Sequence, residues 1–337
     1  YAGGALRAQL APADLDAMAA AATARLSPYA SDRLDARLER TLAAMRATAI
    51  TAAVARSDGT IWTQGVAASG APPRTGPWPG LSEPLVATAV LQLIEERKLA
   101  FETTVERWAP EVSAARHLTI EDLLSHTSGL ALTGPPASAW PPGLGWAPSA
   151  ADAVVLGRVI EALDGAPLAD AVRRRTVERL ELHDTRLGPG AAGGTLSVET
   201  SAWEAVKLLR GLLSDGLTSR DTLQRRLMRL YPTTAAPVRT WQGLGLKVTD
   251  LAADSWNPAD AWVGWAEPRP GGSTVVAYSV RKRAFAALDL QGAGSAESAL
   301  DLLLLDVEAD PGVLRFTPSP PRKSRRKPRP PPRPPRR

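Results

Sequence analysis

Strand-like sequence stands before and after a long helix-like middle part of this chain. Residues 50–62, ITAAVARSDGTIW, hold two apolar runs around Ser57-Asp58-Gly59, and an Asp-Gly step between such runs is a strong hairpin signal. Residues 241–249, 272–280 and 284–290 carry the β-branched, aromatic or alternating apolar residues that are typical of antiparallel strands. An antiparallel sheet completed by such distant segments, with helices between them, predicts an α+β fold.

Apolar residues at helical spacing predict a helix over residues 84–99, with Pro84 in its first turn, where the missing N–H costs little. Residues 12–45 predict one or two helices before the hairpin, and residues 295–307 predict a closing helix. More helices are expected in the middle of the chain, at residues 119–125, 151–164, 168–180, 201–214 and 219–230.

These patterns divide the chain into an N-terminal helical segment at 1–46, a main domain at 47–316 and a tail at 317–337. Within the main domain, residues from about 100 to 235 are expected to form a mostly helical subdomain. A chain of 337 residues, of which 44% are hydrophobic, can bury a large core. No stretch approaches the roughly 18 uncharged apolar residues that a spanning helix needs, so we expect no transmembrane segment. The absence of cysteine excludes disulfides and thiolate nucleophiles.

The last twenty residues, PSPPRKSRRKPRPPPRPPRR, form a strongly basic tail without acidic residues. Because the whole chain carries +5 and the nine tail cations carry +9, the residues before them sum to −4. Proline favours polyproline II and like charges repel, so we expect an extended arm. RNA phosphates are the favoured partner, while DNA, an anionic membrane surface, an SH3-type protein or a solvated linker stay open. The binding residues would be Arg322, Lys323, Arg325, Arg326, Lys327, Arg329, Arg333, Arg336 and Arg337.

Residues 118–130 read LTIEDLLSHTSGL. This run resembles a segment of the serine β-lactamase and penicillin-binding-protein-like family, which includes class C β-lactamases, D-alanyl peptidases, related esterases and a mitochondrial filament-forming member. Further similar segments follow the family's order: VLQLIEERKL at 90–99, PGLGW at 142–146, LGRVIEALDGAPL at 156–168, LELHDTRLG at 180–188 and GLGLKV at 243–248. The resemblance covers about residues 50–314 and implies an antiparallel sheet flanked by helices, with a mostly helical subdomain.

Enzymes of the family attack a carbonyl with the serine of a Ser-x-x-Lys motif at a helix N-terminus. Counting back from VLQLIEERKL places Gly80 at the serine position and Glu83 at the lysine position. Ser82 is the nearest hydroxyl, and we interpret it as a helix N-cap. If a deletion made Ser82 the nucleophile, its partner would be Leu85, which cannot accept a proton.

Two further family motifs are also altered. The Tyr-x-Asn motif corresponds to Pro148-Ser149-Ala150, and the Lys/His-x-Gly motif corresponds to Trp262-Val263-Gly264. Residues 255–280 contain no lysine or histidine that could replace the cation of the third motif. Because catalytic residues act as a unit, three losses in one cleft predict a pseudoenzyme with no catalytic residues.

Other candidate sites in the chain are weaker. His126 has Asp122 before it and Ser128 after it, which suggests a Ser-His-Asp arrangement, but the resemblance implies that HTSG is a structural turn. His117 and His183 stand alone, so we expect no metal, and no cofactor is indicated.

We therefore favour a non-catalytic structural or docking subunit of a larger assembly, in which the folded body contacts protein partners and the tail contacts RNA. An organellar ribosome-like ribonucleoprotein would suit this role. The chain begins at Tyr1 rather than Met, which suggests either a removed targeting segment or a boundary set by cloning, so the sequence does not name the compartment. An organelle, the mitochondrion, is favoured over bacterial export. The alternatives are a serine hydrolase of unorthodox mechanism, acting on an ester or a peptidoglycan-like amide, and a module whose inactive cleft binds a peptide or glycan.

Overall fold

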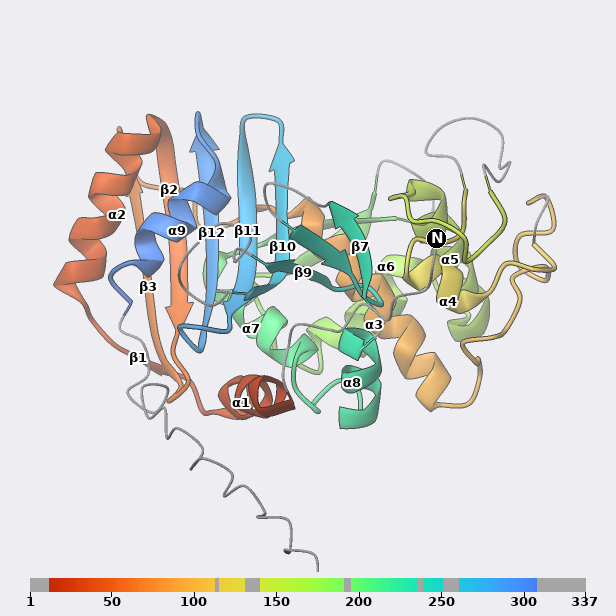
Figure 1. Cartoon of the computed structure of the whole chain (residues 1–337). Helices are drawn as coiled ribbons and strands as arrows, with labels where there is room; N and C mark the ends of the chain where they lie inside the picture. Colours follow the sequence, from red (N-terminus) through yellow and green to blue (C-terminus); the bar gives the residue numbers. More distant parts are fainter. Residues whose placement is uncertain are drawn as a thin grey trace, which may run out of the picture.

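The computed structural model describes residues 12–112, 115–130, 140–190, 195–228, 230–234, 239–250 and 261–307. Within them the chain forms a nine-stranded sheet, a separate three-stranded sheet and helices that pack on both faces of the large sheet (Figure 1). The α+β prediction is confirmed. None of the helices in this described part is both long and apolar enough to cross a membrane. The basic tail lies outside the described residues.

The large sheet has the strand order β1-β3-β2-β12-β11-β10-β9-β8-β7, and only the β1–β3 pair among these described strands is parallel. Its strands are β1 (Ser27–Pro28), β2 (Ala47–Ala55), β3 (Thr60–Ala67), β7 (Tyr231–Thr234), β8 (Arg239–Gln242), β9 (Lys247–Asp250), β10 (Ala261–Arg269), β11 (Gly272–Ser279) and β12 (Ala284–Gly292). The predicted hairpin is formed by β2 and β3. Strand β2 also pairs with β12, where Ala53 lies opposite Ala287, so the two ends of the main domain complete one sheet.

The strand predicted over residues 241–249 is divided in two. Strand β8 ends at Gln242 and β9 begins at Lys247, because the backbone between them turns back. In this turn the N–H of Gly243 donates to the carbonyl of Leu246, and Gly245 adopts a positive φ of 61°. The turn carries Lys247 to a position that a continuous strand would not give it.

The helices agree with the sequence pattern, and residues 12–45 form two of them. They are α1 (Pro12–Thr23), α2 (Asp32–Met45), α3 (Ser82–Glu95), α4 (Ile120–Leu124), α5 (Ala150–Asp164), α6 (Leu168–Val172), α7 (Ala202–Leu212), α8 (Arg220–Met228) and α9 (Ala296–Leu304). The helix expected over 168–180 is shorter, because α6 continues into a single π-helical segment, η2 (Arg173–Val177). A three-residue 3-10 turn, η1 (Pro79–Leu81), precedes α3. The small sheet of β4 (Gly76–Pro77), β6 (Leu196–Thr200) and β5 (Arg186–Pro189) was not predicted.

Two apolar cores lie on opposite faces of the large sheet. Helices α2 and α9 cover one face, and α3, α7 and the middle helices cover the other, as Figure 1 shows. Side chains along β10 alternate between these cores: Trp262 belongs to the α2 and α9 side, whereas Val263 and Trp265 belong to the α3 side. This alternation decides which residues of β10 reach the beginning of α3.

Candidate active site

The turn before α3 contacts strand β10 at a glycine. Gly80 lies in η1, and a Cβ atom built on it would come within 2.7 Å of the Cγ atom of Glu267 and 3.4 Å of the Cβ atom of Trp265. A serine at this position would therefore collide with Glu267. The side chain of Glu267 thus occupies the space where a side chain at position 80, the serine position predicted from the sequence, would begin.

Glu83, which the sequence count places at the family's lysine position, takes part in a network of hydrogen-bonded polar groups. Its Oε1 atom accepts a hydrogen bond from Gln242 Nε2 at 2.7 Å and lies 3.5 Å from His126 Nε2. On the other side of the ring, His126 Nδ1 lies 2.7 Å from Asp152 Oδ2. Ser128 donates to the other oxygen of Asp152 at 2.5 Å. The imidazole is thus held between two carboxylates.

The charges of Glu83 and His126 stabilise one another's ionised forms. Burial alone would raise the pKa of Glu83, but the charges of His126 and Lys247 and the hydrogen bonds from His126 and Gln242 lower it to about 2. Burial opposes protonation of His126, yet Glu83 and Asp152 together raise its pKa to about 10. Burial raises the pKa of Asp152, against the hydrogen bonds that it receives. At neutral pH His126 is therefore a cation that cannot accept a proton.

The partner of His126 was not the one that its sequence neighbours suggested. Asp122 forms a capping box with Thr119 at the start of α4 and also accepts a hydrogen bond from Thr127. Asp152, fully buried in the first turn of α5, binds both His126 and Ser128 instead. Ser128 donates its proton to a carboxylate, so the Ser-His-Asp arrangement considered from the sequence does not form.

Two basic residues lie close to Glu83. Arg226 is completely buried, and burial lowers the pKa of its guanidinium to about 10, opposed by the charge of Glu83. Its guanidinium donates to the backbone carbonyls of Leu244 and Gly245, which fixes the turn before β9. Lys247, the first residue of β9, places its Nζ atom 3.3 Å from Glu267 Oε1.

Three charged side chains around the beginning of α3 are partly exposed. Glu83 is 29% exposed, Lys247 is 34% exposed and Glu267 is 36% exposed. We call these residues, together with Gly80 and His126, the helix-start site. All three charged groups are therefore partly accessible to solvent, and the cavity that Glu83 and His126 line measures only about 20 Å³.

The residues that the sequence predicted for the family's second and third motifs lie outside the helix-start site. Pro148 and Ala150 are exposed and flank Ser149, which caps α5. Trp262 faces the α2 and α9 core, and a Cβ on Gly264 would meet the carbonyl oxygen of Val276 at 2.0 Å, so neither contributes a group to the helix-start site. Trp265 and Glu267 reach the start of α3 in their place.

Ser82 does not act as the predicted N-cap. It is the first residue of α3, and its hydroxyl accepts a hydrogen bond from the backbone N–H of Leu196 in β6 at 3.2 Å. Among the described residues, no group of histidine, aspartate and glutamate is arranged to hold a metal ion.

Lys247, Glu267 and Asp152 are the functional candidates that the sequence did not reveal. Lys247 stands before residues 255–280, which contain no lysine or histidine, and inside a segment whose pattern predicts an apolar strand. Asp152 carried one signal, because an acid is unexpected one turn before Leu156 on the buried side of a helix.

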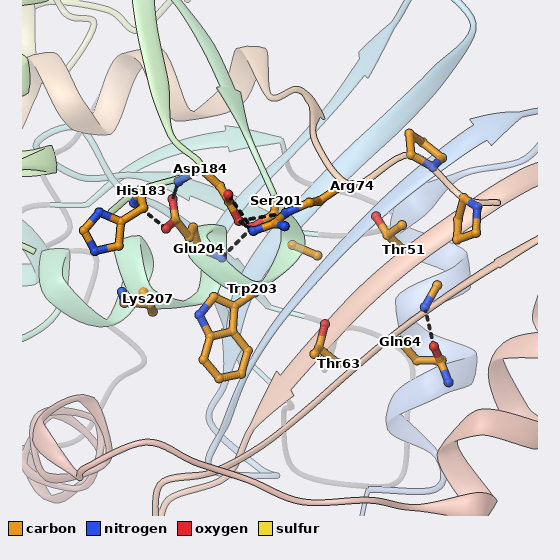
Figure 2. Close-up of a pocket in the computed structure, with 14 residues that line it drawn as sticks. Thr51, Thr63, Gln64, Arg74, His183, Asp184, Ser201, Trp203, Glu204 and Lys207 are labelled. Carbon is orange, nitrogen blue, oxygen red and sulfur yellow. Dashed lines mark hydrogen bonds and ion pairs between the residues drawn. The ribbon is translucent and has the colours of Figure 1, made fainter. Parts of the chain in front are cut away.

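A separate cavity of about 630 Å³ lies between strands β2 and β3 and the beginning of α7 (Figure 2). On its rim Arg74 donates three hydrogen bonds to Asp184, at 2.9, 3.0 and 3.4 Å. The buried carboxylate of Glu204 accepts from the backbone N–H groups of His183 and Asp184. These charged groups pair within the protein, and the cavity shares no lining residue with the helix-start site.

A family model described as Beta-lactamase matches residues 34–309 of the chain. Among curated proteins, Esterase EstB of Burkholderia gladioli is 32% identical over 143 residues, which cover 31% of this chain and 36% of the esterase. The match therefore spans little more than a third of that relative's length. The crystal structure of a D-stereospecific amidohydrolase from Streptomyces sp. is similar with a TM-score of 0.67 at 19% identity, over 81% of this chain and 98% of the other. D-amino acid amidase from Ochrobactrum anthropi SV3 gives a TM-score of 0.68 at 16% identity, over 80% and 98% of the two chains. At these identities the two structures show the fold alone.

These relatives contradict the prediction that the chain is not an enzyme. Those with a named activity are an esterase, an amidohydrolase and an amidase, and none of them is a ribonucleoprotein subunit. The prediction rested on the loss of the motif residues alone. Lys247 of β9 and Glu267 of β10 bring other ionisable groups to the beginning of α3.

Proposed function

Because the chain belongs to the β-lactamase family, we propose that it hydrolyses a carboxylic ester or an amide at the helix-start site. The observation that carries this proposal is the position of Glu83, Lys247 and Glu267, three partly exposed charged groups around the turn where the family has its Ser-x-x-Lys motif. The esterase and amidase names of similar proteins support the substrate class, an activated or simple acyl carbonyl.

Hydrolysis of an acyl group needs a nucleophile, a proton acceptor, and positive charge or N–H donors near the oxyanion. Carboxylates are available as proton acceptors, and Lys247 supplies positive charge. His126 has a different role: held as a cation between Glu83 and Asp152, it fixes the position of Glu83. It is a positioning residue.

The proposal is tested by assaying the purified chain against p-nitrophenyl esters, a chromogenic cephalosporin and D-amino acid p-nitroanilides. We expect turnover of at least one of these substrates, with saturation kinetics that heat denaturation removes. Arg74→Ala, on the rim of the separate cavity, serves as a control that should keep wild-type activity. The absence of turnover on all three substrate classes would refute the proposal.

Binding of RNA by the basic tail is a separate proposal, as is a mitochondrial location. RNA binding is supported only by the sequence of the last twenty residues, which hold nine cations, no acids and interspersed prolines. It is independent of hydrolysis and is tested by truncation, as described in the Discussion.

A further inference from the structure

We propose that Glu267 and Lys247 carry out the hydrolytic step, Glu267 as the general base that activates water and Lys247 as the cation that stabilises the oxyanion. This inference rests on the proposed hydrolase function and assigns its residues. Glu267 comes from β10 and Lys247 from β9, so neither belongs to a motif that the family uses for catalysis at α3.

The first support is the position of Glu267. Its Cγ atom lies 2.7 Å from where a Cβ of residue 80 would be, so its side chain fills the place of the family's nucleophile. Only glycine at position 80 leaves this space free. The same packing places a carboxylate beside the N-terminus of α3, where a carbonyl substrate of a related enzyme would be attacked.

The second support is the pairing of Glu267 with Lys247. The Nζ and Oε1 atoms are 3.3 Å apart, and both side chains are about one-third exposed. A substrate carbonyl oxygen can therefore approach the ammonium group while a water molecule approaches the carboxylate. A cation next to a carboxylate in this arrangement supplies both the proton acceptor and the charge that hydrolysis requires.

The other candidates in the helix-start site are less suited to the role. Glu83 already accepts a hydrogen bond from Gln242 and faces the His126 cation, and its pKa of about 2 makes it a weak base. Ser82 accepts a hydrogen bond from Leu196 N–H, and within the described residues no hydrogen bond joins its hydroxyl to a lysine, tyrosine or histidine.

The reaction balances with water as the only co-reactant. Glu267 takes a proton from water as the water oxygen bonds to the carbonyl carbon, and the carbonyl electron pair moves to its oxygen beside the Lys247 ammonium. When this intermediate collapses, the bond to the leaving oxygen or nitrogen breaks. The proton held by Glu267 passes to that atom, which gives a carboxylic acid and an alcohol or amine and restores the carboxylate.

The inference is tested with Glu267→Gln and Lys247→Gln, with Glu102→Gln as a matched control on an exposed turn. On a substrate that the wild type hydrolyses, we expect kcat of Glu267→Gln to fall by about 100-fold or more, with circular dichroism unchanged. We expect Lys247→Gln to lower kcat by about 10-fold or more with a smaller change in KM, and Glu102→Gln to behave as the wild type.

A fluorophosphonate probe separates this assignment from a serine mechanism. We expect no labelling of the wild type, because water is the nucleophile. Wild-type kcat in Glu267→Gln, or labelling that vanishes in Ser82→Ala, would overturn the assignment while leaving the hydrolase function intact. A wild-type protein without turnover on any ester or amide would refute both.

Discussion

The Nδ1 atom of His126 lies 2.7 Å from the Oδ2 atom of Asp152, 26 positions away in the sequence. The backbone of His126 is strained, because its φ of 56° lies in the left-handed region. Its other nitrogen faces Glu83. The imidazolium therefore joins the turn after α4 to the first turns of both α3 and α5, and this connection has consequences that can be measured.

Replacing His126 with asparagine should destabilise the fold. The substitution leaves the carboxylates of Glu83 and Asp152 near each other without a cation between them, and breaking a buried ion pair costs on the order of 3 kcal/mol. Urea denaturation of the variant measures this loss. His117→Asn is the matched control, because His117 is exposed and should change stability little. Equal unfolding free energies for the two variants would contradict the account.

The same group makes stability depend on pH. The folded-state pKa of His126 is about 10 against an ordinary value of 6.5, so its contribution is complete below 6.5 and is lost as pH rises through about 10. Glu83 has a folded-state pKa of about 2 against 4.5, so its contribution is complete above 4.5 and is lost as pH falls through about 2. We expect the wild type to lose more unfolding free energy than His126→Asn between pH 6.5 and 10. Parallel curves for the two proteins would show that His126 is not held as a cation.

Restoring the serine of the family motif should be unfavourable in this fold. Gly80→Ser places a Cβ against Glu267 and should destabilise the protein by about 1 kcal/mol. In the Gly80→Ser, Glu267→Ala double variant the clash is removed, so the two effects should not add. A thermal or urea double-mutant cycle measures the coupling. Strict additivity would mean that the two positions do not contact each other.

An element of the fold could be predicted from the sequence where neighbouring residues alone specify its conformation. The β2–β3 hairpin and α3 were predicted well, because Asp58-Gly59 and the apolar spacing after Pro84 specify local conformation. The small sheet of β4, β5 and β6 was missed because its strands are short and two of them contain proline.

The candidate site was harder to predict than the fold. The sequence predicted Trp262 of β10 at the position of the family's third motif. Side chains on a strand alternate between its two faces, and Trp262 lies in the core on the α2 and α9 side. Lys247 reaches Glu267 only because the chain turns between β8 and β9. Such juxtapositions arise from tertiary packing, which local patterns in a single sequence do not contain.

The basic tail can be tested without reference to the hydrolase site. Truncation after Phe316 removes nine cations, and we expect it to abolish RNA retention that weakens as salt rises. Filter binding at several salt concentrations, with full-length and truncated chains side by side, provides the measurement. If the truncated body binds RNA equally well at every salt concentration, the tail is not the contact.

The most direct test of the central claim is the initial rate of p-nitrophenyl ester hydrolysis by the wild type and by Glu267→Gln, measured on folded protein under identical conditions. We expect enzyme-dependent turnover by the wild type and a rate lower by about 100-fold or more in the variant. Equal rates in the two proteins would contradict the role of Glu267, and a wild-type rate no higher than the background would contradict the hydrolase function itself.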